Sequence, residues 1–188
     1  MRIPYFPTTR KRLFLPRMLY FAFMPSKLQG RLPYILLVAV ILVLDRWTKA
    51  LVQARFGLND SVTVIDGFFD ITYVRNTGVA FGIFDLVSLP AKSILLSAFT
   101  ALAAVVVTVY SVRSPARNRL LQVALALILG GALGNLYDRL AYGYVVDFLE
   151  FYVGSHHWPS FNVADSAISI GVVLLAIEII RNETPART

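Results

Sequence analysis

The chain contains no cysteine, and only two of its 188 residues are histidines. The absence of cysteine excludes disulfide bonds, thiolate catalysis and zinc or iron–sulfur sites with cysteine ligands. The two histidines, His156 and His157, are adjacent in the sequence. Neighbouring residues do not share a helix face, which disfavours a metal site built on both. We therefore predict no metal and no cofactor, and we interpret the histidines as a solvated or interfacial loop pair.

Charged residues are also scarce, at 15% of the chain, whereas hydrophobic residues make up 57%. A soluble domain is usually about 45–50% apolar. The charges are clustered outside four apolar runs, which predicts an all-α integral membrane protein with four transmembrane helices. The net charge of +7 would suggest nucleic acid in a soluble protein. However, the chain has no Arg-Gly-rich tract, aromatic RNA-binding signature or zinc-finger spacing, so we expect no nucleic-acid partner and assign the charge to membrane topology.

The apolar runs predict membrane spans at residues 32–49, 93–112, 120–136 and 163–180. Residues 1–30 form a basic, irregular segment. It either lies along the membrane surface or is an upstream extension, with Met24 as the true start. Residues 31–182 form the four-helix membrane domain, and residues 183–188 form a polar cytoplasmic tail.

Two short segments between the first two spans, residues 62–65 and 69–74, are rich in β-branched and aromatic residues. The Asp66-Gly67 pair between them is a hairpin signal, which predicts a small β-sheet outside the membrane. In the third span, Gly130-Gly131-Ala132-Leu133-Gly134 allows close approach of helices. We interpret the connection after that span as a loop that carries Asp147, Glu150 and both histidines.

Lysine and arginine are unevenly divided between the two ends of the spans. The side with the N-terminus, the basic loop 113–119 and the C-terminus carries twelve of them, against six on the other side. Positive residues prefer the cytoplasmic side, so we expect both termini in the cytoplasm. Without residues 1–23 the count is seven against six. Most acidic residues lie at the opposite ends, and the unusual polar groups thus collect at the exoplasmic surface.

Two aspartates stand among apolar residues, and ionisable groups inside membrane segments are functional-site candidates by default. Asp165 lies in the first turn of the last apolar run, and Asp147 lies eighteen residues upstream, between Val146 and Phe148. If the two carboxylates approach, they cannot easily both ionise, and the pair titrates as a unit. Such a pair can activate a water, direct it at an amide carbonyl and protonate the leaving amine. The sequence therefore favours aspartic-peptidase chemistry at a membrane surface.

Structural explanations compete with these functional ones. Asn162 and Asp165 have the spacing of a helix N-cap, which accounts for Asp165 without catalysis. Asp45 and Lys49, at positions i and i+4, are either a helix-end ion pair or a polar support for the site. Ser166 could pair with Lys49 as a nucleophile, but helix packing explains it better. No Gly-x-Ser-x-Gly or His-Glu-x-x-His motif is present.

Two functions from other classes also remain open at this point. A small ion- or proton-coupled transporter would place acids near the membrane midplane, but residues 36–44, 93–112 and 167–177 hold no charge. A non-enzymatic assembly factor would use the outer β segment as a docking surface. It would not require Asp147 and Asp165 together.

Five motifs resemble, in order, those of bacterial lipoprotein signal peptidase, the type II signal peptidase. They are Asp45-x-x-Thr48-Lys49, Asn76-Thr77-Gly78-x-Ala80-Phe81, Gly130-Gly131-Ala132-Leu133-Gly134-Asn135-x-x-Asp138-Arg139, Val145-Val146-Asp147-Phe148 and Phe161-Asn162-x-Ala164-Asp165-Ser166. The resemblance covers residues 31–180. Each motif is weak alone, but five in the family's order are very specific.

The resemblance implies a four-helix aspartic endopeptidase of the bacterial inner membrane, with a small exoplasmic β-sheet between helices 1 and 2. Its substrates would be prolipoproteins that carry diacylglyceryl on the lipobox cysteine, and cleavage would fall just before that cysteine. Membrane lipids and globomycin-type inhibitors, which mimic the peptide, are the other expected partners. The expected oligomeric state is a monomer. The acyl chains would hold the scissile bond near headgroup level, where the two aspartates are expected.

Residue by residue, Asp147 and Asp165 match the family's catalytic pair. The supporting and binding positions are matched by Asn76, Asn135, Arg139, Asn162, Gly131, Asp45, Lys49 and Asp138. Two departures stand out. Val79 replaces the family's usual alanine, a change expected to affect packing, and residues 1–23 have no counterpart, which supports Met24 as the start.

Overall fold

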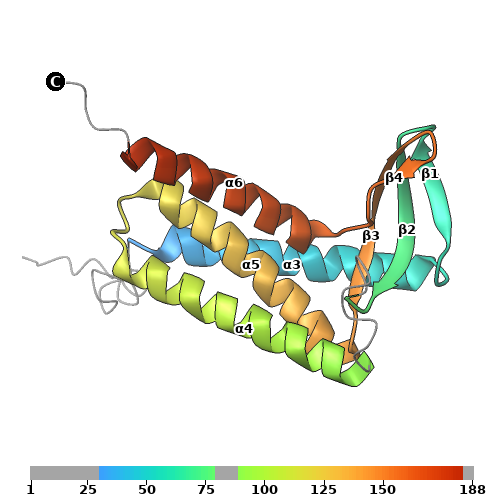
Figure 1. The fold of residues 1–188 in the computed structure, drawn as a ribbon, viewed down its shortest axis with the longest axis horizontal. Helices are drawn as coiled ribbons and strands as arrows, with labels where there is room; N and C mark the ends of the chain where they lie inside the picture. The colour runs from blue at the N-terminus through green and yellow to red at the C-terminus, as the bar shows by residue number, and fades with distance from the viewer. Residues whose placement is uncertain (1–29, 79–88, 184–188) are drawn as a thin grey trace, which may run out of the picture.

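The computed structural model describes residues 30–78 and 89–183 (Figure 1). In chain order these residues form α3 (Leu32–Arg55), β1 (Ser61–Ile65), β2 (Phe69–Asn76), α4 (Leu89–Arg113), α5 (Arg119–Tyr142), β3 (Val145–Val153), β4 (His156–His157) and α6 (Val163–Glu183). The basic segment up to residue 29, the alternative start at Met24, the motif residues 79–81 and the tail residues 184–188 lie outside the described residues.

All four predicted helical runs are helices, and each extends beyond its apolar run. Helix α3 has a proline in its first turn, where the missing N–H costs nothing. The side chain of Asn118 caps α5 by accepting a hydrogen bond from the N–H of Leu121 at 3.3 Å. The same helix is capped at its C-terminus by Gly143, whose φ of 78° is the left-handed conformation that closes many helices.

Three of the described helices are long and apolar enough to cross a membrane: Ala91–Arg113, Arg119–Tyr142 and Val163–Arg181. This is one fewer than the sequence predicted. Helix α3 differs because Asp45, Arg46 and Lys49 all lie in its second half. Its outward side chains are nevertheless apolar, and Val43 is 66% exposed.

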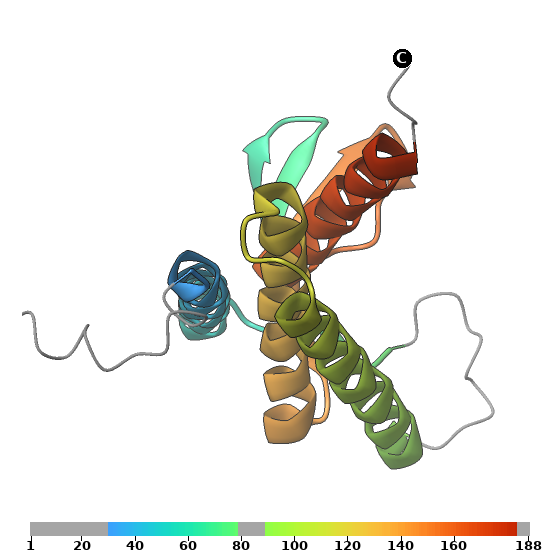
Figure 2. The ribbon, with the colours of Figure 1, turned by 90° about the vertical axis from the view of Figure 1, so that its left-hand side faces the viewer.

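Helix α5 occupies the centre of the bundle, and α3, α4 and α6 are arranged around it (Figure 2). Of its membrane segment, 56% is buried, compared with 17% for α4 and 22% for α6. An apolar helix that exposes most of its side chains is typical of a lipid-facing position. Helix α5 therefore forms the core of the bundle through its contacts with the other helices, while α4 and α6 present apolar surface outward.

The small residues of α5 allow this central packing, as predicted. A Cβ added to Gly131 would lie 2.3 Å from the carbonyl oxygen of Ala164 in α6. A Cβ added to Gly130 would lie 2.9 Å from the Cβ of Ile41 in α3. The glycines thus bring the backbone of α5 against both neighbouring helices.

We expect Gly131→Ala to lower the free energy of unfolding by about 1–3 kcal/mol, the usual cost of overpacking. The cost arises because the new methyl group meets a backbone carbonyl, which cannot rotate away. Gly130→Ala has more room, because the nearest atom to its new methyl group is the Cβ of Ile41 at 2.9 Å, and it should cost less. Thermal melts of both variants in detergent measure the difference, and a melting temperature for Gly131→Ala at or above that of Gly130→Ala would contradict this reading.

Beyond one end of the bundle lies an antiparallel sheet with strand order β1-β2-β3-β4. The predicted hairpin is confirmed: β1 pairs with β2, and Gly67 in the turn has a φ of 73°. The predicted loop after α5 is wrong, because residues 145–153 form β3 and His156–His157 form β4. The sheet therefore combines two strands that precede α4 in the sequence, β1 and β2, with two strands that follow α5, β3 and β4. It is not built only from the segment between the first two helices of the bundle.

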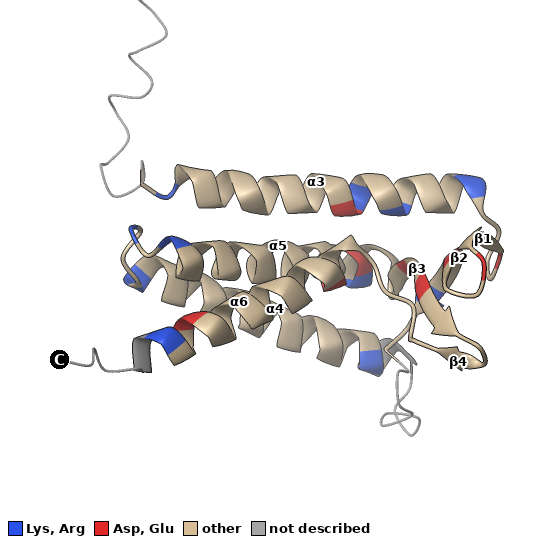
Figure 3. Cartoon of the chain, turned by 90° about the horizontal axis from the view of Figure 1, so that it is seen from above, with Lys and Arg blue, Asp and Glu red and all other residues tan. Residues whose placement is uncertain are grey.

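A small apolar cluster fixes the sheet to the end of α3. It comprises Val52 from α3, Tyr73 from β2, and Val146 and Phe148 from β3. Because Val146 is fully buried beside Asp147, this cluster also sets the position of that aspartate. Most acidic residues lie toward the end of the bundle that carries the sheet (Figure 3).

Candidate active site

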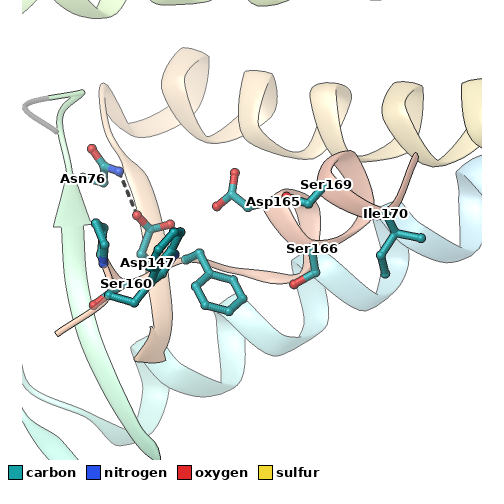
Figure 4. Close-up of a pocket in the computed structure, with 10 residues that line it drawn as sticks. Asn76, Asp147, Ser160, Asp165, Ser166, Ser169 and Ile170 are labelled. Carbon is teal, nitrogen blue, oxygen red and sulfur yellow. Dashed lines mark hydrogen bonds between the residues drawn. The ribbon is translucent and has the colours of Figure 1, made fainter. Parts of the chain in front are cut away.

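The structure brings Asp147 from β3 and Asp165 from α6 to one cavity of about 710 Å³ (Figure 4). The cavity continues along α6 from Asp165 to Ile170. Five residues of helix correspond to about 7.5 Å, so the cavity extends from the sheet into the apolar body of the bundle. The prediction that the two acids meet at one end of the spans is therefore consistent with the fold.

Asp165 occupies the first turn of α6 and takes part in the predicted cap. The side-chain oxygen of Asn162 accepts a hydrogen bond from the Asp165 N–H at 2.9 Å. In return, Oδ2 of Asp165 accepts from the Asn162 N–H at 3.2 Å. Oδ1 is not needed for the cap and accepts from Nδ2 of Asn135 at 2.7 Å. The capping explanation and the functional one are thus compatible, because each uses a different carboxylate oxygen.

Asp147 is almost completely buried, with 2% of its surface exposed. Both of its oxygens accept hydrogen bonds from side-chain amides: Oδ1 from Asn162 at 2.7 Å and Oδ2 from Asn76 at 2.9 Å. Asn76 reaches Oδ2 because β2 runs antiparallel to β3, with Val74 opposite Asp147. Asn162 therefore contacts both acids. Its backbone N–H and side-chain oxygen form the cap with Asp165, and its side-chain N–H donates to Asp147.

The environment raises the pKa of Asp147 from 3.8 to about 7. Burial away from water is the largest cause, and the neighbouring charge of Asp165 adds to it. The hydrogen bonds from Asn76 and Asn162 oppose the rise because they stabilise the ionised carboxylate. Near neutral pH, Asp147 can therefore hold a proton or release it.

An ion cluster lies beside the two acids, buried except for the partly exposed Arg46, and we call it the Lys49 cluster. It comprises Lys49, Asp45, Asp138 and Arg46. The Lys49 ammonium is fully buried and lies 2.8 Å from Oδ2 of Asp45 and 2.9 Å from Oδ2 of Asp138. Arg46 pairs with the other oxygen of Asp138. The cluster holds two cations and two anions, so its charges balance, which is what burial demands.

Both carboxylates of the Lys49 cluster also bind backbone next to the predicted catalytic acids. Oδ1 of Asp45 accepts from the N–H of Ala164 at 3.1 Å, one residue before Asp165. Oδ2 of Asp138 accepts from the N–H of Val146 at 3.2 Å, one residue before Asp147. Lys49 also donates to Oδ1 of Asn135 at 3.1 Å. The cluster therefore links the start of α6 and the start of β3 to the same ammonium group.

Lys49 is consequently unsuited to the role of a general base for Ser166. Its ammonium group contacts Asp45, Asp138 and Asn135. The Ser166 hydroxyl donates to the carbonyl oxygen of Asn162 at 2.9 Å, within the first turn of α6. This geometry argues against a Ser–Lys pair.

Arg139 lies on α5 near the two acids, and its charge acts on both Asp165 and Asp147. Its Nη1 donates weakly to the hydroxyl of Thr100 in α4, at 3.4 Å. Thr100 in turn donates to the carbonyl oxygen of Leu96 at 2.8 Å. The guanidinium therefore supplies positive charge near the site without forming an ion pair with either carboxylate among the described residues.

The two histidines lie on the exposed strand β4, away from the carboxylates of the site. Nδ1 of His157 is 3.0 Å from a carboxylate oxygen of Glu150, and its ring stacks on Tyr152. Across residues 30–78 and 89–183, no three His, Asp or Glu residues are arranged to hold a metal ion.

Sequence reasoning missed two parts of the site. It gave Arg46 no role, although this arginine balances the charge of Asp138. The two residues lie on different helices, α3 and α5, so no short sequence spacing indicates that they pair. It also missed the cavity walls formed by Trp158, Phe161 and Ser169. Trp158 belongs to a connection without periodicity, and no pattern in the sequence could have placed it beside Asp165, whereas Ser169 lies one helical turn after Asp165 and its spacing was an available signal.

Comparisons with known proteins agree on one family. The family model described as signal peptidase (SPase) II matches residues 37–181. The lipoprotein signal peptidase of Syntrophus aciditrophicus is 41% identical over 150 residues, which cover 80% of this chain and 93% of that protein. The one from Geobacter sulfurreducens is 48% identical over 142 residues, which cover 76% of this chain and 88% of that protein.

A solved structure has a similar fold. A bacterial membrane enzyme determined by the in meso method at 1.9 Å resolution has a TM-score of 0.73 and is 33% identical, covering 81% of this chain and 94% of that one. The match to the family model extends from α3 to α6 and includes both acids of the cavity. The chain is a bacterial membrane protein and a peptidase, and it belongs to the signal peptidase II family.

Proposed function

We propose that the protein removes the signal peptide from diacylglyceryl-modified prolipoproteins, cutting on the N-terminal side of the lipidated cysteine. The observation that carries the proposal is the pair of acids, the buried Asp147 and the partly buried Asp165, facing one cavity in a member of this family. Each acid accepts hydrogen bonds from amide groups at both oxygens. Such donors orient the carboxylates while leaving the space between them for a water and a peptide.

In the proposed reaction, the ionised carboxylate takes a proton from a water in the cavity. The protonated carboxylate donates a hydrogen bond to the scissile carbonyl, and the water oxygen attacks the carbonyl carbon. The leaving amine then receives a proton from the pair. The pKa of about 7 for Asp147 favours one proton shared by the two acids near neutral pH.

The membrane setting supports this assignment. We propose that α3 is the fourth membrane span, because the outward side chains of its apolar run are exposed and Arg46 and Lys49 pair with Asp138 of α5. The bundle then crosses the bacterial inner membrane as a monomer, with both termini in the cytoplasm and the sheet at the exoplasmic face. A diacylated substrate is held in the lipid by its acyl chains, and its peptide enters the cavity at headgroup level.

Cleavage of a purified precursor tests the function directly. We expect the detergent-purified protein to shorten a diacylated prolipoprotein on a gel and to leave the same precursor uncut when it lacks the lipid. Globomycin should block the reaction. Equal cleavage of the two precursors would contradict the proposed substrate class, and no cleavage of either would contradict the function.

The pH dependence of cleavage should reflect the shared proton. Above about pH 7, Asp147 ionises as well and the pair loses its proton, so kcat/KM should fall about tenfold per pH unit. Asn76 lowers the pKa of Asp147, so Asn76→Ala should raise that pKa and move the alkaline limb to higher pH. An unchanged or lower midpoint in the variant would refute this assignment of Asn76.

A further inference from the structure

A row of stacked tyrosines and arginines runs across the junction between the bundle and the sheet, and we call it the arginine–tyrosine row. Its members, in spatial order, are Tyr73, Arg75, Tyr144, Tyr142, Arg46 and Tyr137. The Arg75 guanidinium lies 4.9 Å from the centre of the Tyr144 ring and 5.6 Å from that of Tyr73. Tyr144 stacks on Tyr142 with ring centres 5.8 Å apart.

Arg46 extends the row at the other end. Its guanidinium lies 4.4 Å from the centre of the Tyr137 ring and 5.7 Å from that of Tyr142. Two cations are thus held by four rings, of which Tyr73 is buried beneath Arg75 and Tyr137 and Tyr142 are exposed. Interaction with aromatic faces fixes the guanidinium planes and reduces the freedom that each would lose on binding a ligand.

The two arginines differ in how their charge is balanced. Arg46 pairs with Asp138 and donates to the Tyr142 hydroxyl at 3.3 Å. Arg75 is exposed, and its Nε donates to the Tyr73 hydroxyl at 3.0 Å. Within residues 30–78 and 89–183, no carboxylate pairs with Arg75, and its two terminal nitrogens make no hydrogen bond. Its positive charge is therefore available to an anion from outside.

The row lies where the membrane surface is expected. The membrane segment of α5 ends at Tyr142, and Tyr144 follows two residues later. Tyr137 and Tyr142 are both exposed, at 51% and 41%. Tyrosine rings are enriched at the level of lipid headgroups. The phosphate groups of the adjacent leaflet lie at this level too.

We infer that Arg75, held by Tyr73 and Tyr144, binds the phosphodiester of a phospholipid in the leaflet beside the sheet. A guanidinium presents two parallel N–H groups that match two phosphate oxygens. The ligand chemistry is a phosphate anion, and the membrane is its source because the row continues the end of a membrane helix. This site does not depend on the proposed catalytic acids. It positions β2, which carries Asn76, relative to the lipid surface.

Lipid binding to the purified protein tests the inference. The probe is dioleoylphosphatidylglycerol added to detergent-solubilised protein, with the bound fraction measured by native mass spectrometry. We expect Arg75→Gln to bind it about tenfold more weakly than the unmodified protein, the effect of losing hydrogen bonds from a charged group. Arg55→Gln is the matched control, because Arg55 is exposed at the sheet end of α3 and stacks on no ring among the described residues.

Dioleoylglycerol, which lacks the phosphate, should not bind at this site, and millimolar sodium phosphate should compete only weakly. Equal affinities of Arg75→Gln and the unmodified protein would overturn the inference, as would an equal loss in Arg55→Gln. Binding of inorganic phosphate as tight as that of the lipid would overturn the membrane as the source. If Arg75→Gln loses its cooperative melt, Tyr144→Leu replaces it, since that variant keeps the charge and removes the ring. Unchanged lipid affinity of Tyr144→Leu would then refute the site.

Discussion

Replacing Asp147 or Asp165 with asparagine should reduce cleavage of a diacylated prolipoprotein by at least about a thousandfold, because positioned proton transfer contributes about 10²–10⁴-fold per group. Asparagine has nearly the same shape as aspartate, but it can neither take a proton from water nor donate one to the leaving amine. Cleavage rates are measured on gels over hours for the variants, and the unmodified protein is diluted until its reaction takes a similar time. Together these measurements cover a thousandfold difference in rate.

The variants should remain folded, although at some cost. Both oxygens of Asp147 accept from amide N–H groups. In Asp147→Asn, the new NH₂ group would lie opposite the NH₂ group of Asn76 or Asn162, and two donors cannot bond to each other. The buried donor left without an acceptor should lower the free energy of unfolding by about 1–3 kcal/mol. A melt that is shifted but still cooperative, together with lost cleavage, supports the pair.

Asp66→Asn is the matched control, because Asp66 lies exposed in the turn between β1 and β2. It should cleave at the rate of the unmodified protein. A variant at Asp147 or Asp165 that kept a rate near that of the control would exclude the residue concerned from catalysis.

The largest loss of stability is expected from Lys49→Met, at about 3–5 kcal/mol, the usual cost of removing one partner from a buried ion pair. The Lys49 ammonium is the shared partner of Asp45 and Asp138. Without it, Asp45 has no cation among residues 30–78 and 89–183, while Asp138 retains Arg46. Thermal or chemical unfolding in detergent measures the change.

The double variant Asp45→Asn/Lys49→Met should recover a large part of that loss, because it restores a balanced charge inside the bundle. Arg55→Met, on the exposed end of the same helix, should change stability by no more than about 0.5 kcal/mol. If Lys49→Met and Arg55→Met melted alike, the Lys49 cluster would have no structural role.

The sequence predicted those features that depend on local spacing. The capping of α6 by Asn162 followed from a three-residue spacing, and the β1–β2 hairpin followed from Asp66-Gly67. The close approach of α5 to its neighbours followed from the spacing of its glycines. Each of these signals acts within a few residues, so no knowledge of the fold was needed.

The strand β3 was missed for a physical reason. Residues Val145 to Phe148 are buried on both faces, between the end of α3 and the cavity. A strand that is covered on both sides loses the alternation of polar and apolar residues that identifies an exposed strand. The β-branched and aromatic residues from Val145 to Val153 were the remaining signal. The role of Arg46 was missed because its partner comes from another helix.

The hydrogen bond from the Ala164 N–H to Asp45 joins residues 119 positions apart in the chain. The polypeptide is made from its N-terminus, so Asp45 is present long before α6 is synthesised. Until that last helix inserts, Asp165 is absent and Asp147 has neither Asn162 nor a second acid beside it. Proteolytic capacity would therefore arise only at the final step of biogenesis, and a nascent or truncated chain could not digest its neighbours in the membrane.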